Sequence, residues 1–288
     1  MNAVQQLPAV VNGRYKAVRV IARGGMSTVY EVEHVLTGER LALKILTWGR
    51  GVPPEVLERF KREARASARI KSQHVVRVLD ADVSTELGGA PFLVMELLDG
   101  TDLERATAAA RPDRLTVVEW LRQLAGAIDK AHQLGIIHRD LKPENLFLAR
   151  QEEGPPIIKV LDFGIVKVSD DGGGVTASGD IIGTPAYMAP EQATAGGRLT
   201  PAADRYTLGL VAYRLLTGES YHGSDIFEVM SQLLYQPLTP PTARHPELGS
   251  AFDGWFARAC AREPEQRFPS VGEQVEALAQ ALGVAPTA

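Results

Sequence analysis

The chain has 288 residues, of which 45% are hydrophobic and 23% are charged, and its formal net charge is −4 at pH 7. This composition is ordinary for a globular protein, and the length allows one large domain or two lobes. The acidic balance argues against general nucleic-acid binding, which needs a basic surface. The single cysteine, Cys260, excludes an internal disulfide and is typical of a reducing compartment. Because Cys260 lies in a helical pattern, we expect it to be a buried small hydrophobic residue.

Targeting signals and membrane segments are not evident in the sequence. Residues 1–12 contain no basic segment followed by a long apolar one, so no secretion signal is expected. The most apolar later stretch, 208–216, contains Arg214 and is shorter than the about 20 residues that span a bilayer. We therefore expect a cytoplasmic chain without a membrane segment. One alternative stays open, namely the cytoplasmic domain of a longer, membrane-anchored protein that continues past Ala288.

The N-terminal third predicts a sheet with one helix. Residues 14–47 alternate apolar and β-branched residues with polar ones, which predicts three antiparallel strands. Two more strands are expected at 75–81 and 92–97, joined by a turn at 86–89. We expect six residues of the first three strands to face inward: Val18, Val20, Val29, Val32, Leu41 and Leu43.

A helix is predicted from about Pro54 to Lys71, between the third and fourth strands. Proline near its start and Glu55 in its first turn suit the positive end of a helix dipole. Glu63 lies beside the apolar stripe of this helix and can face the interior. The alternative for any charge here is a solvated pair on the outer face, worth about 0.3 kcal/mol.

The remainder of the chain is mostly helical in pattern. Thr116 and Glu119 have the spacing of a capping box, which predicts a helix from Thr116 to about Leu134, ended by Gly135. A short buried strand at 157–161 leads to Asp162. Further helices are expected at 201–217, 225–236, 250–261 and 270–282.

Residues 138–145 read His-Arg-Asp-Leu-Lys-Pro-Glu-Asn and combine three groups suited to phosphoryl transfer. The carboxylate of Asp140 can orient an attacking hydroxyl and accept its proton. The ammonium of Lys142 can offset charge on the transferring group, and the carboxamide of Asn145 is an oxygen ligand suited to Mg²⁺. The alternative is a charged surface turn without a chemical role.

Two further motifs follow in order, Asp162-Phe163-Gly164 and Ala189-Pro190-Glu191. With 138–145, they resemble the signature set of the protein kinase family, most closely the bacterial serine/threonine protein kinases of the eukaryotic type. Lys142 and the segment 183–185, Gly-Thr-Pro, favour a serine/threonine over a tyrosine kinase.

The resemblance implies an α+β, bilobal protein kinase fold. A small lobe over 13–97 would hold a five-stranded antiparallel sheet plus one main helix, and a large, mostly helical lobe would cover 98–283. Residues 1–12 would form an N-terminal extension and 284–288 a flexible tail. Two structural roles also follow from it: Asp204 would brace the backbone of the catalytic loop, and Arg267 would pair with Glu191.

ATP and Mg²⁺ are the cofactors that the resemblance implies. Asp162 and Asn145 would hold Mg²⁺ against the phosphates. Lys44, paired with Glu63, would position the α- and β-phosphates. Lys142 would contact the γ-phosphate and Asp140 would act on the hydroxyl of the protein substrate.

A glycine-rich hairpin and a hinge would complete the nucleotide site. Here the chain departs from the family's G-x-G-x-x-G pattern, because Ala22 and Ser27 replace the first and third glycines and Gly24 alone matches. We expect a weakened grip on the nucleotide. The hairpin and adenine contacts would come from Ile21, Ala22, Arg23, Gly24, Gly25, Ser27, Val29, Ala42, Met95, Glu96, Leu98 and Phe147. From the sequence alone, the apolar members could equally be ordinary core residues.

The long loop 162–191 carries three candidate phosphorylation sites, Thr176, Ser178 and Thr184. Phosphate on Thr176 or Ser178 would pair with Arg139 and order the loop. The alternative is that these hydroxyls only solvate the loop. A homodimer in which one copy phosphorylates the other is an alternative route to this modification.

Two other functions compete with a kinase that acts on Ser and Thr of proteins. A pseudokinase would bind nucleotide without turnover, and only the irregular glycine loop favours it. A small-molecule phosphotransferase would share the catalytic loop but would have no need of Ala189-Pro190-Glu191. The sequence does not indicate the substrate or an activating signal.

Overall fold

The computed structural model describes residues 9–24, 27–46, 52–163, 185–194, 196–223 and 225–285, with the side chain of Arg59 left out. By its internal contacts the chain divides into two compact units. The first comprises Met1–Lys71 and Val76–Asp99, and the second comprises Ser72–Val75 and Gly100–Ala288.

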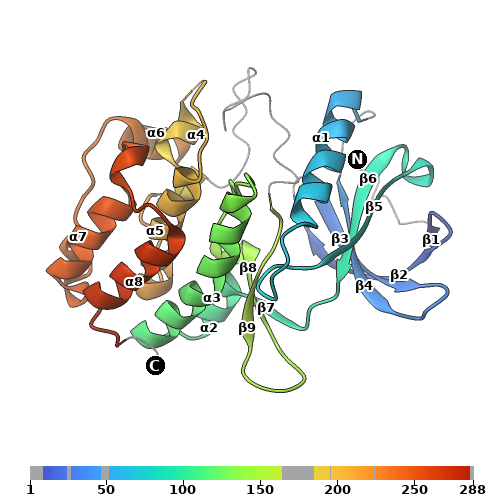
Figure 1. Cartoon of the computed structure of the whole chain (residues 1–288), viewed down its shortest axis with the longest axis horizontal. Helices are drawn as coiled ribbons and strands as arrows, with labels where there is room; N and C mark the ends of the chain where they lie inside the picture. The colour runs from blue at the N-terminus through green and yellow to red at the C-terminus, as the bar shows by residue number, and fades with distance from the viewer. Residues whose placement is uncertain are drawn as a thin grey trace. The chain divides into compact units, whose positions relative to one another are not determined.

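The first unit is built on an antiparallel sheet with the strand order β1-β2-β3-β4-β6-β5 (Figure 1). Its strands are β1 (Val10–Val11), β2 (Tyr15–Arg23), β3 (Ser27–His34), β4 (Arg40–Leu46), β5 (Val78–Ser84) and β6 (Ala90–Glu96). The five predicted strands are confirmed. The two-residue β1 is a sixth strand, which pairs with β2 and is too short to give a periodic signal. β5 begins later than predicted, because Val75 belongs to the second unit and bridges Val160 there.

The two faces of this sheet differ in what they carry. Strand partners lie on the same face and neighbours along a strand alternate. One face therefore holds a hydrophobic cluster made of Val11, Tyr15, Tyr30, Val32, Leu41, Leu43, Ile45, Phe92 and Val94. The predicted inward positions Val32, Leu41 and Leu43 are confirmed. The opposite face carries Val29, which pairs with Lys44.

Two of the predicted inward positions are wrong. Val18 is 42% exposed and Val20 is 37% exposed. The pairing of β2 with β3 shifts register between Ala17 and Arg19 and again between Val20 and Ala22. The first shift leaves Val18 without a partner in β3, which breaks the alternation that a sequence pattern assumes. Val20 pairs with Tyr30 of the cluster but lies beyond Tyr15 and Lys16, the residues of β2 that β1 pairs with, so it stays partly exposed.

Helix α1 (Pro54–Ser67) supplies the one main helix of this unit. Proline stands at its first position as predicted, and Phe60 and Ala64 are buried. The helix ends four residues before the predicted Lys71. Beyond Ser67 the chain tightens into a turn in which the N–H of Ile70 donates to the carbonyl of Ser67, and the Ile70 side chain is buried.

The second unit combines helices with a small sheet of strands in the order β7-β8-β9. The strands are β7 (Gly100–Asp102), β8 (Leu146–Ala149) and β9 (Ile157–Val160). The helices are α2 (Leu103–Ala109), α3 (Arg114–Gln133), α4 (Pro190–Ala193), α5 (Ala202–Thr217), α6 (Ile226–Leu234), α7 (Ser250–Ala259) and α8 (Val271–Ala281). The predicted strand at 157–161 and the four predicted helices after residue 200 are confirmed within a few residues.

The capping box predicted at Thr116 is wrong. The N-cap of α3 is Asp113, whose carboxylate accepts the N–H of Thr116 at 2.7 Å, so the helix begins earlier. An aspartate three residues before Thr116 performs the same task as the predicted hydroxyl. The end of the helix is confirmed, because Gly135 has φ 75°.

Helix α3 packs beside α8, far away in sequence (Figure 1). The carboxylate of Asp129 in α3 accepts the N–H of Val271 at 2.8 Å and that of Gly272 at 2.9 Å, which joins α3 to the start of α8. The predicted burial of Cys260 is confirmed, since it is 1% exposed and burial raises the pKa of its thiol.

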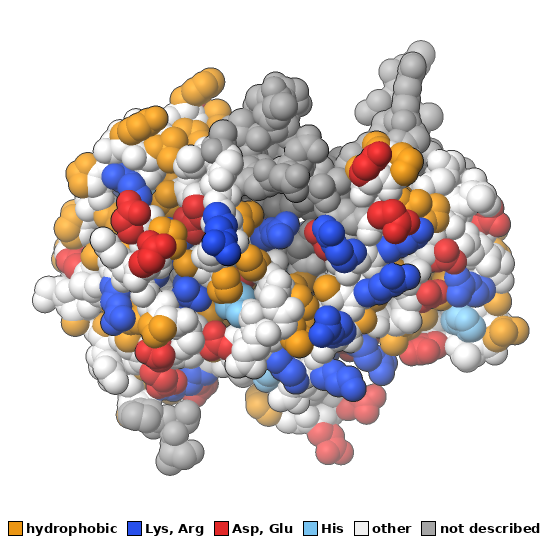
Figure 2. Space-filling model, turned by 45° about the horizontal axis from the view of Figure 1, so that its top comes forward, with side chains coloured by type: hydrophobic (Ala, Val, Ile, Leu, Met, Phe, Trp, Pro, Cys, Tyr) orange, Lys and Arg blue, Asp and Glu red, His pale blue; other side chains and the backbone are white. Residues whose placement is uncertain are grey.

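In Figure 2, basic and acidic side chains are interspersed on the visible face, and neither kind of charge predominates. Such a mixed surface agrees with the small net charge of −4. Among the described residues, no helix is both long and apolar enough to cross a bilayer.

Candidate active site

A buried carboxylate, Asp204 near the start of α5, holds the backbone at the start of the motif 138–145. It accepts the N–H of His138 and the N–H of Arg139, both at 2.8 Å, and Nε2 of His132 at 2.7 Å. The predicted bracing role of Asp204 is confirmed. Burial by itself would raise the pKa of the Asp204 carboxyl. The hydrogen bond and charge of His132 and the contacts with His138 outweigh burial and hold this pKa below its ordinary value.

His138 connects the catalytic motif to the segment that follows β9. Its Nδ1 lies 3.2 Å from the N–H of Asp140 and accepts it, so the ring proton is on Nε2. Nε2 donates to the carbonyl of Leu161 at 2.7 Å. The ring also contacts that of Phe163, with centroids 4.8 Å apart. His138 thus links residue 140 to residues 161–163.

Asp140, Lys142 and Asn145 lie together as the sequence predicted. Nδ2 of Asn145 donates to the carbonyl of Asp140 at 2.7 Å and to its Oδ2 at 3.1 Å. Nζ of Lys142 lies 3.7 Å from the same Oδ2. Because the amide nitrogen of Asn145 makes both contacts, its oxygen is the atom that a metal ion would use.

Asp162 is positioned beside this group by its neighbour. The N–H of Leu161 donates to the carbonyl of Asn145 at 2.9 Å, which fixes the residue before Asp162. Asp162 has φ 55°, in the left-handed region that residues other than glycine rarely adopt. Backbone strain of this kind is concentrated at functional sites.

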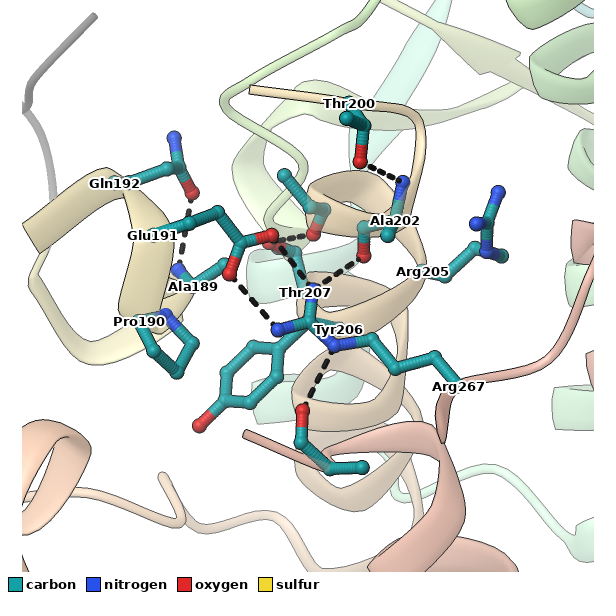
Figure 3. Close-up of polar contacts among 12 residues, drawn as sticks. Ala189, Pro190, Glu191, Gln192, Thr200, Ala202, Arg205, Tyr206, Thr207 and Arg267 are labelled. Atoms are coloured by element: carbon teal, nitrogen blue, oxygen red, sulfur yellow. Dashed lines mark hydrogen bonds and ion pairs between the residues drawn. The ribbon is translucent and has the colours of Figure 1, made fainter. Parts of the chain in front are cut away.

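The segment Ala189-Pro190-Glu191 is anchored to the helices of the second unit (Figure 3). The carboxylate of Glu191 receives two hydrogen bonds from Arg267, at 2.7 and 2.8 Å, and the predicted pair is confirmed. Just before it, the carbonyl of Tyr187 accepts the hydroxyl of Thr207 in α5 at 3.0 Å. These contacts fix the end of the long loop to α5 and to residue 267.

In the first unit, one sheet face gathers the residues expected at the nucleotide. Ala42 pairs with Met95 across β4 and β6, and Lys44 pairs with Val29 across β3 and β4. All four lie on the face opposite the hydrophobic cluster. Lys44 is only 5% exposed. A buried ammonium is costly unless an anionic group pairs with it.

The glycine-rich hairpin is paired up to its turn. Ala22 pairs with Val29, Arg23 pairs with Thr28, and the N–H of Gly24 donates to the carbonyl of Ser27 at 2.8 Å. Among the described residues, a Cβ at Gly24 would meet only Ser27, at 3.5 Å or more, which is ordinary contact. Gly25 lies outside the described residues, as do Thr176, Ser178 and Thr184 of the long loop.

The structure brings the predicted residues together in two groups. The second unit gathers Asp140, Lys142, Asn145 and Asp162, and the first gathers the sheet-face residues. Phe147 lies in β8, opposite Asp102 and Lys159. His132 and Gln192 were not predicted as members of the site, and His138 was given no role although it opens the motif 138–145. The contacts of His132 with Asp204, of His138 with Leu161 and of Gln192 with Arg139 join segments far apart in the chain, so spacing within one segment does not predict them.

Each unit by itself carries features of a protein kinase: the sheet face in the first, and the loop and anchored segment in the second. The family model described as protein kinase domain matches residues 15–274, and the chain belongs to this family. The predicted α+β protein kinase fold is therefore confirmed.

Named relatives are bacterial. The chain is 39% identical over 283 residues to the serine/threonine-protein kinase Pkn1 of Myxococcus xanthus, covering 98% of this chain and 40% of that protein. It is 36% identical over 274 residues to the serine/threonine-protein kinase PknH of Mycobacterium bovis, covering 94% of this chain and 44% of that one. The PknI kinase domain of Mycobacterium tuberculosis superposes with a TM-score of 0.77 at 30% identity, covering 97% of this chain and 100% of that domain. The chain thus spans less than half the length of these two curated relatives.

Proposed function

We propose that this protein transfers the γ-phosphoryl group of ATP to serine and threonine hydroxyls of proteins. The observation that carries the proposal is the Asp140 carboxylate, which has Nδ2 of Asn145 at 3.1 Å and Nζ of Lys142 at 3.7 Å. The loop thus holds a base (Asp140), a cation (Lys142) and an amide ligand (Asn145) close together. Phosphoryl transfer needs such groups, because it depends on positioning the reactants and neutralising the charge of the phosphoryl group.

The oxygen donors of this loop fit Mg²⁺. Among the described residues, no group of three or more His, Cys, Asp or Glu forms a metal site. Mg²⁺ needs no such group, because it is commonly bound by one or two carboxylates together with substrate phosphates. Asp162 and the Asn145 oxygen would hold it, and the bound ion would neutralise charge on the phosphates.

Lys44 and Glu63 are the proposed nucleotide-positioning pair of the first unit. Lys44 would contact the α- and β-phosphates, and Glu63 on α1 would hold its ammonium. The adenine would lie against the sheet face that carries Val29, Ala42 and Met95, with the backbone of residues 96–98 at its edge.

Protein hydroxyls are favoured over small molecules as acceptors for two reasons. The relatives Pkn1 and PknH carry the name serine/threonine-protein kinase. The anchored segment 185–191 forms a built surface next to the catalytic loop, and a transferase for small metabolites would not require it. We further propose that the protein acts in the cytoplasm.

Radiolabelled ATP tests the proposal. The purified chain is incubated with γ-labelled ATP, MgCl2 and a generic protein such as myelin basic protein, alongside Asp140→Asn and Lys44→Met. We expect label in the protein from the wild type and a loss of about 100-fold or more in both variants. A wild type that binds ATP in a thermal-shift assay yet transfers no label would instead be a pseudokinase. Label found only in small molecules would indicate the third function.

Phosphorylation of the long loop is the proposed means of activation. Phosphate on Thr176 or Ser178 would add about −1.5 to −2 charges and could pair with Arg139. Intact-mass analysis after incubation with ATP should show added phosphate, and the double variant Thr176→Ala/Ser178→Ala should be less active. Equal activity of the double variant would remove this proposal. If a transient homodimer carries out the reaction, the initial rate should rise with the square of the enzyme concentration.

A further inference from the structure

Both polar atoms of the Gln192 side-chain amide, next to Glu191 in the chain, make hydrogen bonds. Gln192 lies in the short α4 and is 4% exposed. Its Oε1 accepts the N–H of Ala189 at 3.0 Å (Figure 3). Its Nε2 donates to the carbonyl of Arg139 at 3.0 Å. One buried amide therefore joins the anchored segment to the catalytic loop.

The carbonyl that Gln192 holds belongs to the peptide group that leads into Asp140. The N–H of this same peptide group, contributed by Asp140, is held by Nδ1 of His138 at 3.2 Å. The peptide plane is thus fixed at both ends by side chains. Arg139 has φ 66°, an unfavourable backbone conformation for arginine. A strained conformation persists only where surrounding contacts enforce it.

Loss of the contact would act on Asp140 directly. The carbonyl of Arg139 would lose this donor, and the strained peptide would lose one of the two side-chain contacts that hold it. Rotation of this peptide changes the direction of the Asp140 side chain. A displacement of about 1 Å at a catalytic group can cost about 100-fold in rate.

We propose that Gln192 is a positioning residue for phosphoryl transfer, acting through the Arg139 carbonyl on the orientation of Asp140. The inference rests on the proposed kinase function and adds a residue to its machinery. It also assigns a route by which the placement of the segment 185–192 controls the catalytic loop. This route is separate from the anchor formed by Glu191 and Arg267, which holds the segment to the helices and does not touch residue 139.

Gln192→Met tests the role, because methionine keeps the length of the side chain and removes both the donor to Arg139 and the acceptor for Ala189. We expect kcat for a protein substrate to fall about tenfold or more, while KM for ATP changes less than about twofold, since the first unit is untouched. Assays are run well below the thermal midpoint of each variant, so that loss of folded protein does not enter.

A matched control is available in the same unit. Gln274 in α8 is also fully buried, and its Nε2 donates to the carbonyl of Arg205 at 2.9 Å. Gln274→Met removes a comparable hydrogen bond between a buried amide and an arginine carbonyl. It should leave kcat within about twofold of the wild type, because this hydrogen bond does not touch the catalytic loop.

Gln192→Glu supplies a second readout that a merely structural role would not produce. A carboxylate at this position keeps an acceptor for Ala189 but repels the Arg139 carbonyl, so the variant should be slow at pH 8. Burial raises the pKa of such a carboxyl, and its protonated form can donate as glutamine does. The ratio of variant to wild-type kcat should therefore rise as the pH is lowered from 8 to 6.

Three results would overturn the positioning role of Gln192, and a fourth would remove the proposed kinase function. The positioning role is overturned if Gln192→Met keeps kcat within about twofold of an active wild type, or if Gln274→Met lowers kcat as much. A flat ratio for Gln192→Glu across the pH range also overturns it. A wild type without any transfer activity would remove the proposed function itself, which the wild-type assay reveals before any variant is compared.

Discussion

Arg267 and Glu191 form a buried, two-point ion pair that fixes the end of the long loop to the helical unit. The Arg267 side chain is 0% exposed and that of Glu191 is 10% exposed. Arg267 also donates to the carbonyls of Ala261 and Ala202, both at 2.8 Å, and its guanidinium lies 4.9 Å from the centre of the Tyr206 ring. All three nitrogens of the Arg267 guanidinium thus donate hydrogen bonds, and these bonds offset the cost of burying its positive charge.

Arg267→Met should therefore destabilise the second unit strongly. It removes the donor of the Glu191 carboxylate and of three backbone carbonyls, those of Ala261, Ala202 and Arg262. Removal of one partner of a buried pair costs about 3 to 5 kcal/mol. Urea unfolding followed by circular dichroism measures the change. The double variant Arg267→Met/Glu191→Leu should recover part of the loss, because it leaves no unpaired charge.

Arg122→Met is the matched control for this prediction. Arg122 makes a similar two-point pair with Glu276, at 2.7 and 2.9 Å, but the Glu276 side chain is 52% exposed. Solvated pairs contribute about 0 to 1 kcal/mol. A loss for Arg122→Met as large as that for Arg267→Met would contradict the claim that burial of the pair decides its effect.

Asp204 should make stability depend on pH in the acid range. Its pKa is lowered in the folded state, so between the folded value and the unfolded value of about 3.9 the unfolded chain binds more protons. Its contribution is complete above the unfolded pKa and is lost as the pH falls through the folded pKa. Asp204→Asn removes this carboxylate, so the difference in unfolding free energy from the wild type should be constant above about pH 5 and should shrink below about pH 4. A difference that stays constant down to pH 3 would show that the carboxylate charge is not the cause.

Two helical glycines should respond to alanine in opposite directions. A Cβ at Gly209 in α5 would lie 2.6 Å from Sγ of Cys260 and 3.1 Å from Cβ of Ala259. A Cβ at Gly126 in α3 would meet no atom of the described residues within 4 Å. Gly209→Ala should cost about 1 to 3 kcal/mol through overpacking. Gly126→Ala should add about 0.5 to 1 kcal/mol through helix propensity. Thermal melts of both variants measure this, and Gly209→Ala/Cys260→Ala should recover part of the loss.

Glu63→Ala should slow phosphoryl transfer if Glu63 holds Lys44 in the active state. We expect a fall in kcat/KM for ATP of about tenfold or more. Glu58→Ala on the same helix is the control, because Glu58 is an exposed residue that pairs with Lys61 at 2.8 Å. Unchanged turnover by Glu63→Ala, measured with the label assay, would remove the proposed pair.

The predictions that the structure confirmed concern helix ends and strand faces, which depend on residues close together in the chain. Gly135 and Gly218 end their helices with φ 75° and 76°, as glycine without a Cβ is free to do. Alternation placed Leu41 and Leu43 in the core, because period two is a property of every regular strand. The same rule failed at Val18 in β2, because the register shift beside it arises from pairing with another strand. It failed at Val20 because this residue lies beyond the part of β2 that pairs with β1.

The amino-acid sequence by itself determined the chemical groups and their local settings, including the carboxylate, amine and amide of residues 140–145 and most helix boundaries. Such features depend on spacing within one segment, and so they can be read along the chain. The family resemblance already implied the roles of Asp204 and Arg267, which the structure confirmed. Only the tertiary structure decided that Gln192 and His138 hold the peptide group that leads into Asp140. The contacts of Gln192 and Arg267 join residues that lie up to 76 positions apart. Their formation depends on how the segments pack, and packing is set by the whole chain and not by any single stretch of it.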